Sequence, residues 1–317
     1  MSPPSAIVVG AGIVGAACAE SLAEGGCHVT VLEAAFAGAG TTATAMGHLV
    51  AMDDSEAQFA LTTFSRRLWA ERVPSLPPEV EDDGCGTLWV AADEEEMAIV
   101  RRKAAFYAAR GERAEILDAA ALREAEPQLR PGLAGALLVP GDRVLYPPAA
   151  ARFLLEAAQR RGAEAWTGLR VETIEPGRVR CCGGRTLEAD VVVNAAGAEA
   201  PRLTPALPIA PRKGHLVITD RYPGFLRHQV VELGYLKSAH TLTRESVAFN
   251  VQPRKTGQLL VGSSRELVGF DPSINRPLCA RMLRRAEGYI PGLARLRALR
   301  TWTGFRPATP DKLPLVG

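Results

Sequence analysis

The chain has 317 residues, which is enough for about two domains. Hydrophobic residues make up 47% of it and charged residues 23%, values that are typical of a globular protein and argue against a disordered one. Its 37 basic and 35 acidic residues give a formal net charge of +2, so no excess of positive charge favours nucleic acid or an anionic membrane as a partner.

The six cysteines do not form a metal-binding pattern. They include no C-x-x-C motif and no histidine at zinc spacing, which argues against a zinc or iron–sulfur site. The adjacent Cys181 and Cys182 are expected to be two reduced thiols in a hairpin. No apolar stretch is long enough to span a membrane, and glycines interrupt the N-terminal apolar run. We therefore expect no metal site, no transmembrane segment and a cytoplasmic location.

Residues 6–33 have the pattern of a βαβ unit that binds a dinucleotide. Residues 7–9 form a short apolar run, and residues 16–23 are good helix formers without proline. A second run, rich in β-branched residues, covers residues 29–32 and ends at the acidic Glu33. The order of strand, helix and strand matches the first half of a nucleotide-binding α/β domain.

Three glycines between the first strand and the helix have G-x-G-x-x-G spacing. Gly10 permits a tight turn, Gly12 lets the backbone approach a pyrophosphate, and Gly15 lets the helix pack closely on the strand. The N-terminus of the helix offers N–H groups to phosphate, and Glu33 is placed to accept a hydrogen bond from a ribose hydroxyl. These residues alone do not distinguish NAD from FAD.

The next segment, residues 37–48, is small, glycine-rich and hydroxylated. A loop of this composition can approach a ligand closely and donate backbone N–H groups and threonine hydroxyls to it. The alternative is a flexible surface loop. The position directly after a nucleotide half-site, and the near absence of charged residues, favour the ligand-binding interpretation.

The rest of the chain alternates between helices and strands up to about residue 214 and then becomes rich in strands. Helices are predicted at residues 53–72, 94–110, 118–124, 146–161 and 275–289. Strands are predicted at residues 87–91, 133–140, 169–175, 179–187, 215–219, 246–252 and 258–262, the last three in an antiparallel sheet. Residues 190–197 are predicted to form a buried apolar strand that ends in a turn of small residues, the typical end of a nucleotide-contacting strand.

Five sequence motifs occur in an order that is typical of one enzyme family. They are residues 7–15 (IVVGAGIVG), 40–48 (GTTATAMGH), 190–197 (DVVVNAAG), 211–214 (PRKG) and 303–311 (TGFRPATPD). With this set, the chain resembles the FAD-dependent D-amino-acid oxidase, glycine oxidase and D-amino-acid dehydrogenase family. It is also similar to the flavin subunits of hydroxyproline dehydrogenase and hydrogen cyanide synthase.

The resemblance implies an α/β fold with two interleaved domains. A Rossmann-like FAD-binding domain would comprise residues 1–80, 144–212 and 303–317. A substrate domain of α+β type, built on an antiparallel sheet, would comprise residues 81–143 and 213–302. The family continues beyond the position of Gly317 into a segment that completes the flavin site, so the resemblance implies that the C-terminal part of the FAD-binding domain is missing here.

The resemblance also implies FAD as the cofactor and assigns residues to it. The candidate cofactor-binding residues are Gly10, Gly12, Ile13, Val14, Gly15, Glu33, Ala34, Thr41, Thr42, Ala45, Gly47, His48, Val171, Ala195, Ala196 and Gly197. His48 matches the position that faces the flavin ring, and Val171 matches the residue whose backbone meets the adenine.

Three residues are candidates for the catalytic site. Arg306, expected in a stiff turn between Gly304 and Pro307, matches the arginine that pairs with the substrate carboxylate, and a planar guanidinium suits bidentate binding of that group. His48 is the second candidate and Asn250, where similar glycine oxidases carry an aromatic residue, is the third. Each also has a structural alternative: Arg306 as a brace for the last loop, His48 as a donor to a backbone carbonyl, and Asn250 as an ordinary strand residue.

Other polar residues receive weaker assignments. Tyr222 and Tyr235 are candidates for the border of the pocket. His215, His228 and His240 are scattered over predicted strands and loops, and receive no role.

The leading interpretation is an FAD-dependent oxidoreductase that oxidises the α C–N bond of a small amino or imino acid by hydride transfer to the flavin. The substrate class includes a D-amino acid, glycine or a hydroxyproline-like acid, and the partners would be this substrate and the other subunits of a hetero-oligomeric dehydrogenase. The alternative is a non-catalytic or truncated nucleotide-binding module. An NAD-dependent dehydrogenase is disfavoured because the segment from Thr41 to His48 suits a flavin better.

Overall fold

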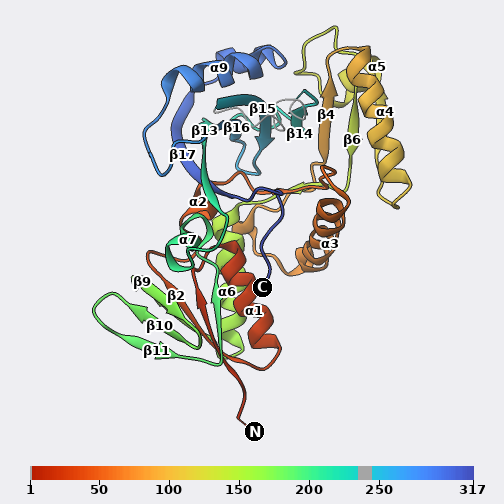
Figure 1. Cartoon of the computed structure of the whole chain (residues 1–317). Coiled ribbons are helices and arrows are strands. Elements are labelled where there is room, and N and C mark those ends of the chain that lie inside the picture. Colours follow the sequence, from red (N-terminus) through yellow and green to blue (C-terminus); the bar gives the residue numbers. More distant parts are fainter. Residues whose placement is uncertain (1, 235–244) are drawn as a thin grey trace.

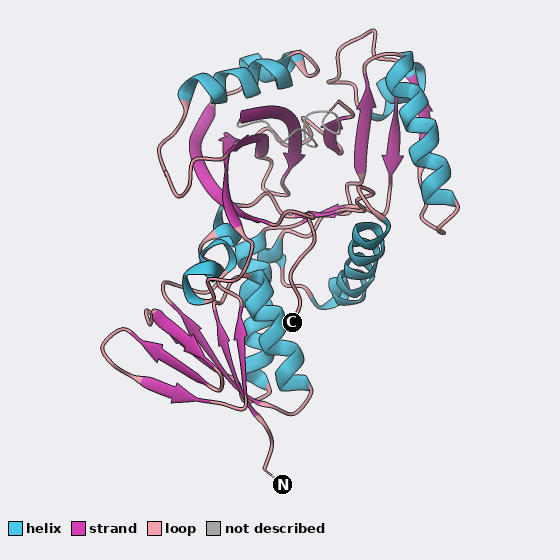
Figure 2. Ribbon diagram, viewed as in Figure 1, coloured by secondary structure: helices cyan, strands magenta, loops and turns pink. Residues whose placement is uncertain are grey.

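The computed structural model describes residues 2–234 and 245–317. Two sheets dominate the described chain: a small parallel sheet near the N-terminus and a large sheet at the opposite end of the molecule (Figure 1, Figure 2). The parallel sheet has the strand order β12-β1-β2-β8, formed by Val191–Asn194, Ser5–Val9, His28–Glu33 and Glu164–Thr167. The predicted βαβ unit is confirmed as β1, α1 (Ile13–Glu24) and β2.

The parallel sheet is the middle of three layers. Alternate residues of β1 point to opposite faces, as strand geometry requires. Val8 packs against α1 and α6 (Pro147–Arg160) on one face. Ile7 and Val9 pack on the other face against a small antiparallel sheet of three strands, β9 (Val171–Glu175), β10 (Arg178–Cys181) and β11 (Thr186–Glu188). Burying one such aliphatic side chain contributes about 1.5 to 3 kcal/mol, so the βαβ unit is held from both sides.

Strand β12 differs from the prediction of a buried strand. It is the last strand in the order of the parallel sheet, and Val191 is 46% exposed. An apolar run predicts a strand, but it does not specify whether neighbours lie on both sides of it. Among the described residues, β12 pairs only with β1.

The large sheet has the order β17-β13-β16-β15-β14-β4-β6-β5. These strands are Ala298–Ala308, Ala210–Thr219, Leu259–Glu266, Glu245–Pro253, Gln229–Glu232, Thr87–Ala91, Gly135–Val139 and Glu115–Asp118. Its pairs are antiparallel as predicted, except for β14 and β4, which run parallel. The sheet therefore combines strands from residues 81–143 with strands from residues 210–308, although the domain boundaries given above stay a prediction.

Helices cover both faces of the large sheet. Leu88 and Val90 of β4 belong to the core that includes Met282 of α9 (Arg276–Glu287). Trp89, between them, belongs to the opposite core, which includes Met97 of α4 (Glu94–Ala108). The other helices are α2 (Thr41–Thr44), α3 (Glu56–Arg72), α5 (Ala119–Ala125) and α7 (Ala200–Leu203), with 3₁₀ turns at Val73–Ser75, Pro78–Val80, Gly197–Glu199 and Pro291–Arg295. The remaining strands, β3 (His48–Leu49) and β7 (Arg143–Val144), pair with each other.

The predicted helices are confirmed with small shifts at their ends. The helix expected from residue 53 begins at Glu56, because Ser55 caps it by accepting a hydrogen bond from Gln58 N at 3.1 Å. Asp118 caps α5 as predicted, accepting from Ala120 N and Ala121 N. The glycine-rich segment of residues 37–48 is not wholly a loop, since it contains the single helical turn α2.

The prediction that Arg306 lies in a turn is wrong. Arg306 lies in β17, directly opposite Arg212 of β13, in a pairing that runs the length of both strands. Gly304 and Pro307 suggest a turn locally, but long-range pairing overrides that signal. Proline is tolerated here because β17 is the edge strand, where a missing N–H costs no hydrogen bond.

Strand β17 also connects the large sheet to the glycine-rich segment. Thr41 Oγ1 donates a hydrogen bond to Phe305 O at 2.7 Å, and Trp302 Nε1 donates to Thr44 O at 3.3 Å. These bonds place α2, from the nucleotide-binding side, against a strand of the large sheet. The region between the two sheets is where the candidate site is found.

Candidate functional site

A cavity of about 2490 Å³ extends from the βαβ unit to the edge of the large sheet. Pockets for drug-sized ligands usually have about 300 to 1,000 Å³, so this cavity has room for a dinucleotide and a second small molecule. It is lined by all of the predicted cofactor-binding residues except Gly15, and by Arg306. The assignments of these residues to a cofactor stay predictions, but the fold brings them to one place.

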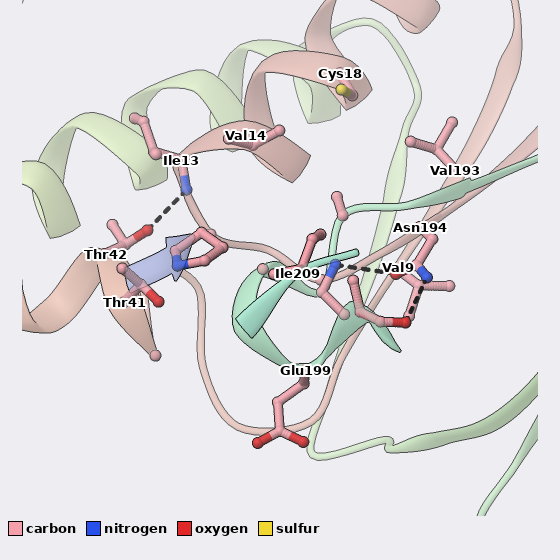
Figure 3. Close-up of a pocket in the computed structure, with 18 of the residues that line it drawn as sticks. Val9, Ile13, Val14, Cys18, Thr41, Thr42, Val193, Asn194, Glu199 and Ile209 are labelled. Carbon is pink, nitrogen blue, oxygen red and sulfur yellow. Dashed lines mark hydrogen bonds between the residues drawn. The ribbon is translucent and has the colours of Figure 1, made fainter. Parts of the chain in front are cut away.

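The turn between β1 and α1 forms the floor of one end of the cavity. Gly12 directly precedes the helix, at the position where a side chain often caps the first turn. Because glycine has no side chain, position 12 does not compete for the N–H groups of that turn. Thr42 Oγ1 accepts a hydrogen bond from Ile13 N at 3.0 Å, which holds α2 beside the helix N-terminus (Figure 3). Helix N-termini of this kind bind phosphate.

Gly15 contributes by packing and not by lining the cavity. A β-carbon at Gly15 would lie 1.9 Å from Gly10 O, far inside contact distance. The helix can therefore approach the first strand only because position 15 has no side chain, as predicted from the spacing of the glycines.

Glu33 organises the backbone on two sides of the cavity. Its Oε2 accepts a hydrogen bond from Ala11 N at 2.8 Å, and its Oε1 accepts one from Ala35 N at 2.7 Å. A carboxylate has about four acceptor positions, so two remain for the hydroxyl groups of a ligand. The predicted contact with a ribose is compatible with this second, structural role.

The turn after β12 forms the opposite wall. Asn194 Nδ2 donates hydrogen bonds to Ala200 O at 3.0 Å and to Thr204 Oγ1 at 2.9 Å, which hold the small-residue turn in place. Figure 3 shows Asn194 beside Val9, across the cavity from Ile13 and Thr42. The lining residues Ala195, Ala196 and Gly197 follow directly. Their small side chains leave room for a ligand close to the backbone.

The other end of the cavity contains Arg306 and His48. Arg306 Nη1 donates a hydrogen bond to Ser264 O at 3.2 Å, which links β17 to β16 across β13. The guanidinium also lies close enough to His48 to affect its charge. The pKa of His48 is lowered to about 4. Burial of the ring is the larger cause and the positive charge of Arg306 the smaller one, whereas the Gln252 side chain acts in the opposite direction. His48 is therefore a neutral imidazole at physiological pH.

The sequence-predicted Asn250 lies apart from this lining. It is a buried residue of β15, and its Oδ1 has no hydrogen-bond partner among the described residues. It is nevertheless near the site, because a β-carbon at Gly262 would meet both Asn250 Oδ1 at 2.9 Å and Met46 Sδ at 3.1 Å. A role for Asn250 in the reaction stays a prediction.

The sequence reasoning missed three polar residues of this end. Arg212 and Arg265 line the cavity, and the side chain of Gln252 interacts with His48 without meeting the geometry of a hydrogen bond. Arg212 belongs to a motif that was recognised, but only the pairing of β13 with β17 shows that its side chain shares a face with Arg306. Tyr222 lies outside the lining and accepts a hydrogen bond from Arg297 N, whereas Tyr235 and His240 lie outside the described residues.

The described residues contain no group of three or more histidine, cysteine, aspartate or glutamate side chains arranged to hold a metal ion. The cysteines in this part of the chain are free thiols, with Cys181 buried and Cys182 exposed. Within the same residues, no helix combines the length and the apolar character needed to cross a membrane.

The neutral state of His48 predicts a specific pH dependence of stability. Above the pKa of an unfolded histidine, near 6.5, both states are neutral at this position. As the pH falls from about 6.5 to about 4, the unfolded chain binds a proton that the folded chain does not, so stability falls, by at most about 3 kcal/mol. Urea unfolding at several pH values should show that the free energy of unfolding of His48→Gln falls less over this pH range than that of the parent.

The matched control for this experiment is His28→Gln, because His28 is an exposed residue of β2. It should leave the pH dependence of the parent unchanged. If His48→Gln and the parent lose the same free energy of unfolding between pH 6.5 and 4, His48 is protonated in the folded protein and the assignment of a neutral imidazole is wrong.

Comparison with known proteins identifies a family whose sequence model matches this chain. The family model described as FAD dependent oxidoreductase (DAO) matches residues 5–317. Hydrogen cyanide synthase subunit HcnC from Pseudomonas aeruginosa is 28% identical, over 98% of this chain and 84% of its own. Glycine oxidase from Geobacillus kaustophilus is 29% identical, over 98% of this chain and 83% of its own.

A solved structure has the same fold. The crystal structure of glycine oxidase from Geobacillus kaustophilus aligns with a TM-score of 0.88 and 27% identity, over 100% of this chain and 86% of that one. The arrangement of a parallel nucleotide-binding sheet and a large mixed sheet is therefore common to both proteins.

Proposed function

Because this chain belongs to the DAO family of FAD-dependent oxidoreductases, we propose that it oxidises the α C–N bond of a small amino or imino acid. One observation carries the proposal: a single cavity joins the nucleotide cradle to Arg306. A cofactor in the cradle and a carboxylate on Arg306 would share one cavity. The similarity to glycine oxidase, a protein named for an amino-acid substrate, supports the same substrate class.

FAD is the cofactor of this family, and the residues of the cavity fit it. The first turn of α1 is a cradle for phosphate to which Gly12 contributes no competing side chain, although Thr42 Oγ1 takes the N–H of Ile13. Glu33 keeps acceptor positions for a ribose. Thr41, Thr42, Ala45, Gly47 and His48 would continue along the cofactor from there. Bound FAD supplies the two-electron acceptor that takes a hydride from the α-carbon of the substrate.

The residues of the chain bind and orient the substrate. Arg306 is held by Ser264 O through Nη1, so its guanidinium has a defined direction within the cavity. A carboxylate paired with it would be fixed at two points, which also fixes the direction of the α C–H bond. His48 contributes a neutral ring, which can donate or accept a hydrogen bond without attracting a second carboxylate.

The two other finer assignments are also proposals. HcnC is named as a subunit, which supports the expectation that this chain has partner subunits in a hetero-oligomeric dehydrogenase. Asn250, buried near Met46, is the third candidate for the substrate site.

The experiment measures the visible absorption of the protein loaded with FAD and then desalted. We expect a retained flavin spectrum that is bleached anaerobically by at least one acid from a panel of glycine, D- and L-amino acids, N-alkylated glycines and cyclic imino acids, with the corresponding imine or oxo acid as product. Retained FAD without bleaching by any member of the panel would favour the non-catalytic nucleotide-binding module.

A further inference from the structure

A chain of hydrogen bonds crosses the large sheet from the N-terminus of α9 to the guanidinium of Arg306. It begins at Asn275, whose side chain caps α9 by accepting a hydrogen bond from Leu278 N at 3.1 Å. It continues through His215 of β13 and Ser264 of β16, which are both fully buried. It ends at Ser264 O, which accepts a hydrogen bond from Arg306 Nη1 at 3.2 Å. A residue that lines the cavity is therefore connected to a helix outside it.

The two ends of this chain lie on opposite faces of the sheet. Side chains alternate along β13, so His215 shares a face with Val217, which belongs to the same core as Met282 of α9. Gly214 lies on the other face, where a β-carbon would be 2.2 Å from Arg306 Nη1. The head of Arg306 thus crosses β13 directly beside the backbone of His215, on the side of the sheet away from α9.

Ser264 joins the two faces because its side chain and its main chain have different partners. Its Oγ accepts a hydrogen bond from His215 N at 3.0 Å and lies 2.8 Å from His215 Nδ1. The register of β13 and β16 shifts between Lys213 and Val217, and the hydroxyl bonds to β13 within that interval. Two contacts with one histidine restrict the position of Ser264, and its carbonyl is the group that accepts from Arg306.

The ring of His215 has one protonation state that fits these contacts. Asn275 N donates to Nε2 at 3.0 Å, so Nε2 carries no hydrogen, and the hydrogen of the neutral ring is on Nδ1, toward Ser264 Oγ. Burial is the largest cause that lowers the pKa of His215, although Glu266 acts in the opposite direction. Glu266 Oε1 also accepts a hydrogen bond from Asn275 Nδ2 at 2.9 Å, which holds Asn275 beside the ring.

We propose that Ser264 and His215 are positioning residues for the substrate carboxylate, because they fix the carbonyl that orients the guanidinium of Arg306. The inference rests on the proposed function, since it takes Arg306 as the site of the carboxylate. It adds that recognition of the carboxylate depends on hydrogen bonds made on the face of the sheet away from the cavity. Loss of the Ser264 hydroxyl should weaken this recognition although the hydroxyl itself does not touch the substrate.

The test measures recognition of a carboxylate without catalysis. Propionate and propionamide have nearly the same shape, but only propionate is charged, and neither has an α C–N bond that could be oxidised. Each is titrated by calorimetry into the protein with excess FAD, and the ratio of the two affinities measures the preference for a carboxylate. Ser264→Ala should lower this affinity ratio about 3- to 10-fold, as expected for the loss of one well-placed hydrogen bond. An unchanged affinity ratio would overturn the proposal.

Two substitutions of His215 separate its two contacts. Asparagine places an amide near the position of Nδ1, and glutamine places an amide near the position of Nε2. His215→Asn should therefore keep the bond to Ser264 and most of the affinity ratio, whereas His215→Gln should keep the bond to Asn275 and lower the ratio as Ser264→Ala does. Equal ratios, or the opposite order, would show that His215 only supports the cap of α9 and would overturn its role. This pair of variants also decides the question if Ser264→Ala does not fold.

Thr219→Val is the matched control. Thr219 Oγ1 accepts a hydrogen bond from Leu259 N at 3.0 Å, so this variant also removes a buried hydroxyl that bonds β13 to β16. Thr219 does not line the cavity, and its loss should leave the affinity ratio unchanged. An equal fall of the ratio in Thr219→Val and Ser264→Ala would show that any loosening of the two strands weakens the site, and the specific role of Ser264 would be wrong.

Flavin reduction separates this inference from the proposed function. Bleaching of the flavin by an amino acid, together with an affinity ratio that does not depend on Ser264 or His215, would sustain the proposed function and overturn the inference. A ratio that depends on both residues, without bleaching by any acid, would sustain the positioning of a carboxylate and overturn the proposed function. A parent protein that binds propionate and propionamide equally well would overturn the inference, because Arg306 would then not select a carboxylate.

Discussion

Gly15→Ala is expected to lower the free energy of unfolding by about 2 to 4 kcal/mol and to abolish retention of FAD on desalting. The added methyl group would be placed 1.9 Å from Gly10 O, and this neighbour is a backbone atom of the cradle. Relief of the contact requires α1 to move away from β1, which displaces the N–H groups that would hold the phosphates. Urea unfolding and the visible absorption of the desalted protein measure the two effects.

Gly25→Ala, at the residue that follows the last turn of the same helix, is the matched control. A β-carbon at Gly25 would have Ser21 O as its nearest neighbour, at 3.4 Å, and the residue has a negative φ of −72°. This variant should change stability by less than about 1 kcal/mol and retain FAD. If Gly15→Ala behaves like Gly25→Ala in both measurements, the close contact between helix and strand is not needed for cofactor binding.

Arg306→Met is expected to remove the preference of the protein for an amino acid over the corresponding decarboxylated amine. Loss of one partner of a desolvated charge pair costs about 2 to 5 kcal/mol, so the acid should lose roughly 30-fold or more in its efficiency of flavin reduction. Arg306→Lys keeps the charge but loses the planar fork, and it should retain part of the preference. The measurement is anaerobic bleaching of the flavin by each acid and its amine.

Arg300→Met provides the control on the same strand. Arg300 is an exposed residue of β17 that does not line the cavity, so its loss should leave the preference intact. An Arg306→Met variant that still favours the acid as strongly as the parent would show that Arg306 braces β16 through Ser264 O and that the carboxylate is bound elsewhere.

Local patterns in the sequence were sufficient for the nucleotide-binding unit. The apolar run of residues 7–9, the spacing of Gly10, Gly12 and Gly15, and the second strand ending at Glu33 all interact over short distances along the chain. The structure forms the strand, helix and strand at these positions, and it places the carboxylate of Glu33 on Ala11 N and Ala35 N. The assignment of Gly15 to helix packing followed from the same local geometry.

Errors occurred where partners far along the chain decide the structure. Gly304 and Pro307 flank Arg306 closely and predict a turn, yet pairing with β13 extends this segment as a strand. The run of residues 190–197 predicts a strand, but its position at the edge of the parallel sheet depends on which strands lie beside it. Local sequence carries no information on either point, because the pairing partner lies about a hundred residues or more away.

The dinucleotide-binding βαβ unit can be predicted from local sequence, because the strand, the glycines, the helix and the acid are contiguous and their backbone geometry is specified by neighbouring residues. The folded chain, by contrast, is needed to see that Arg212, Arg265 and Arg306 share one face and one cavity. The direction of a side chain in a sheet depends on strand order and register, and these are set by hydrogen bonds between segments that are distant in sequence.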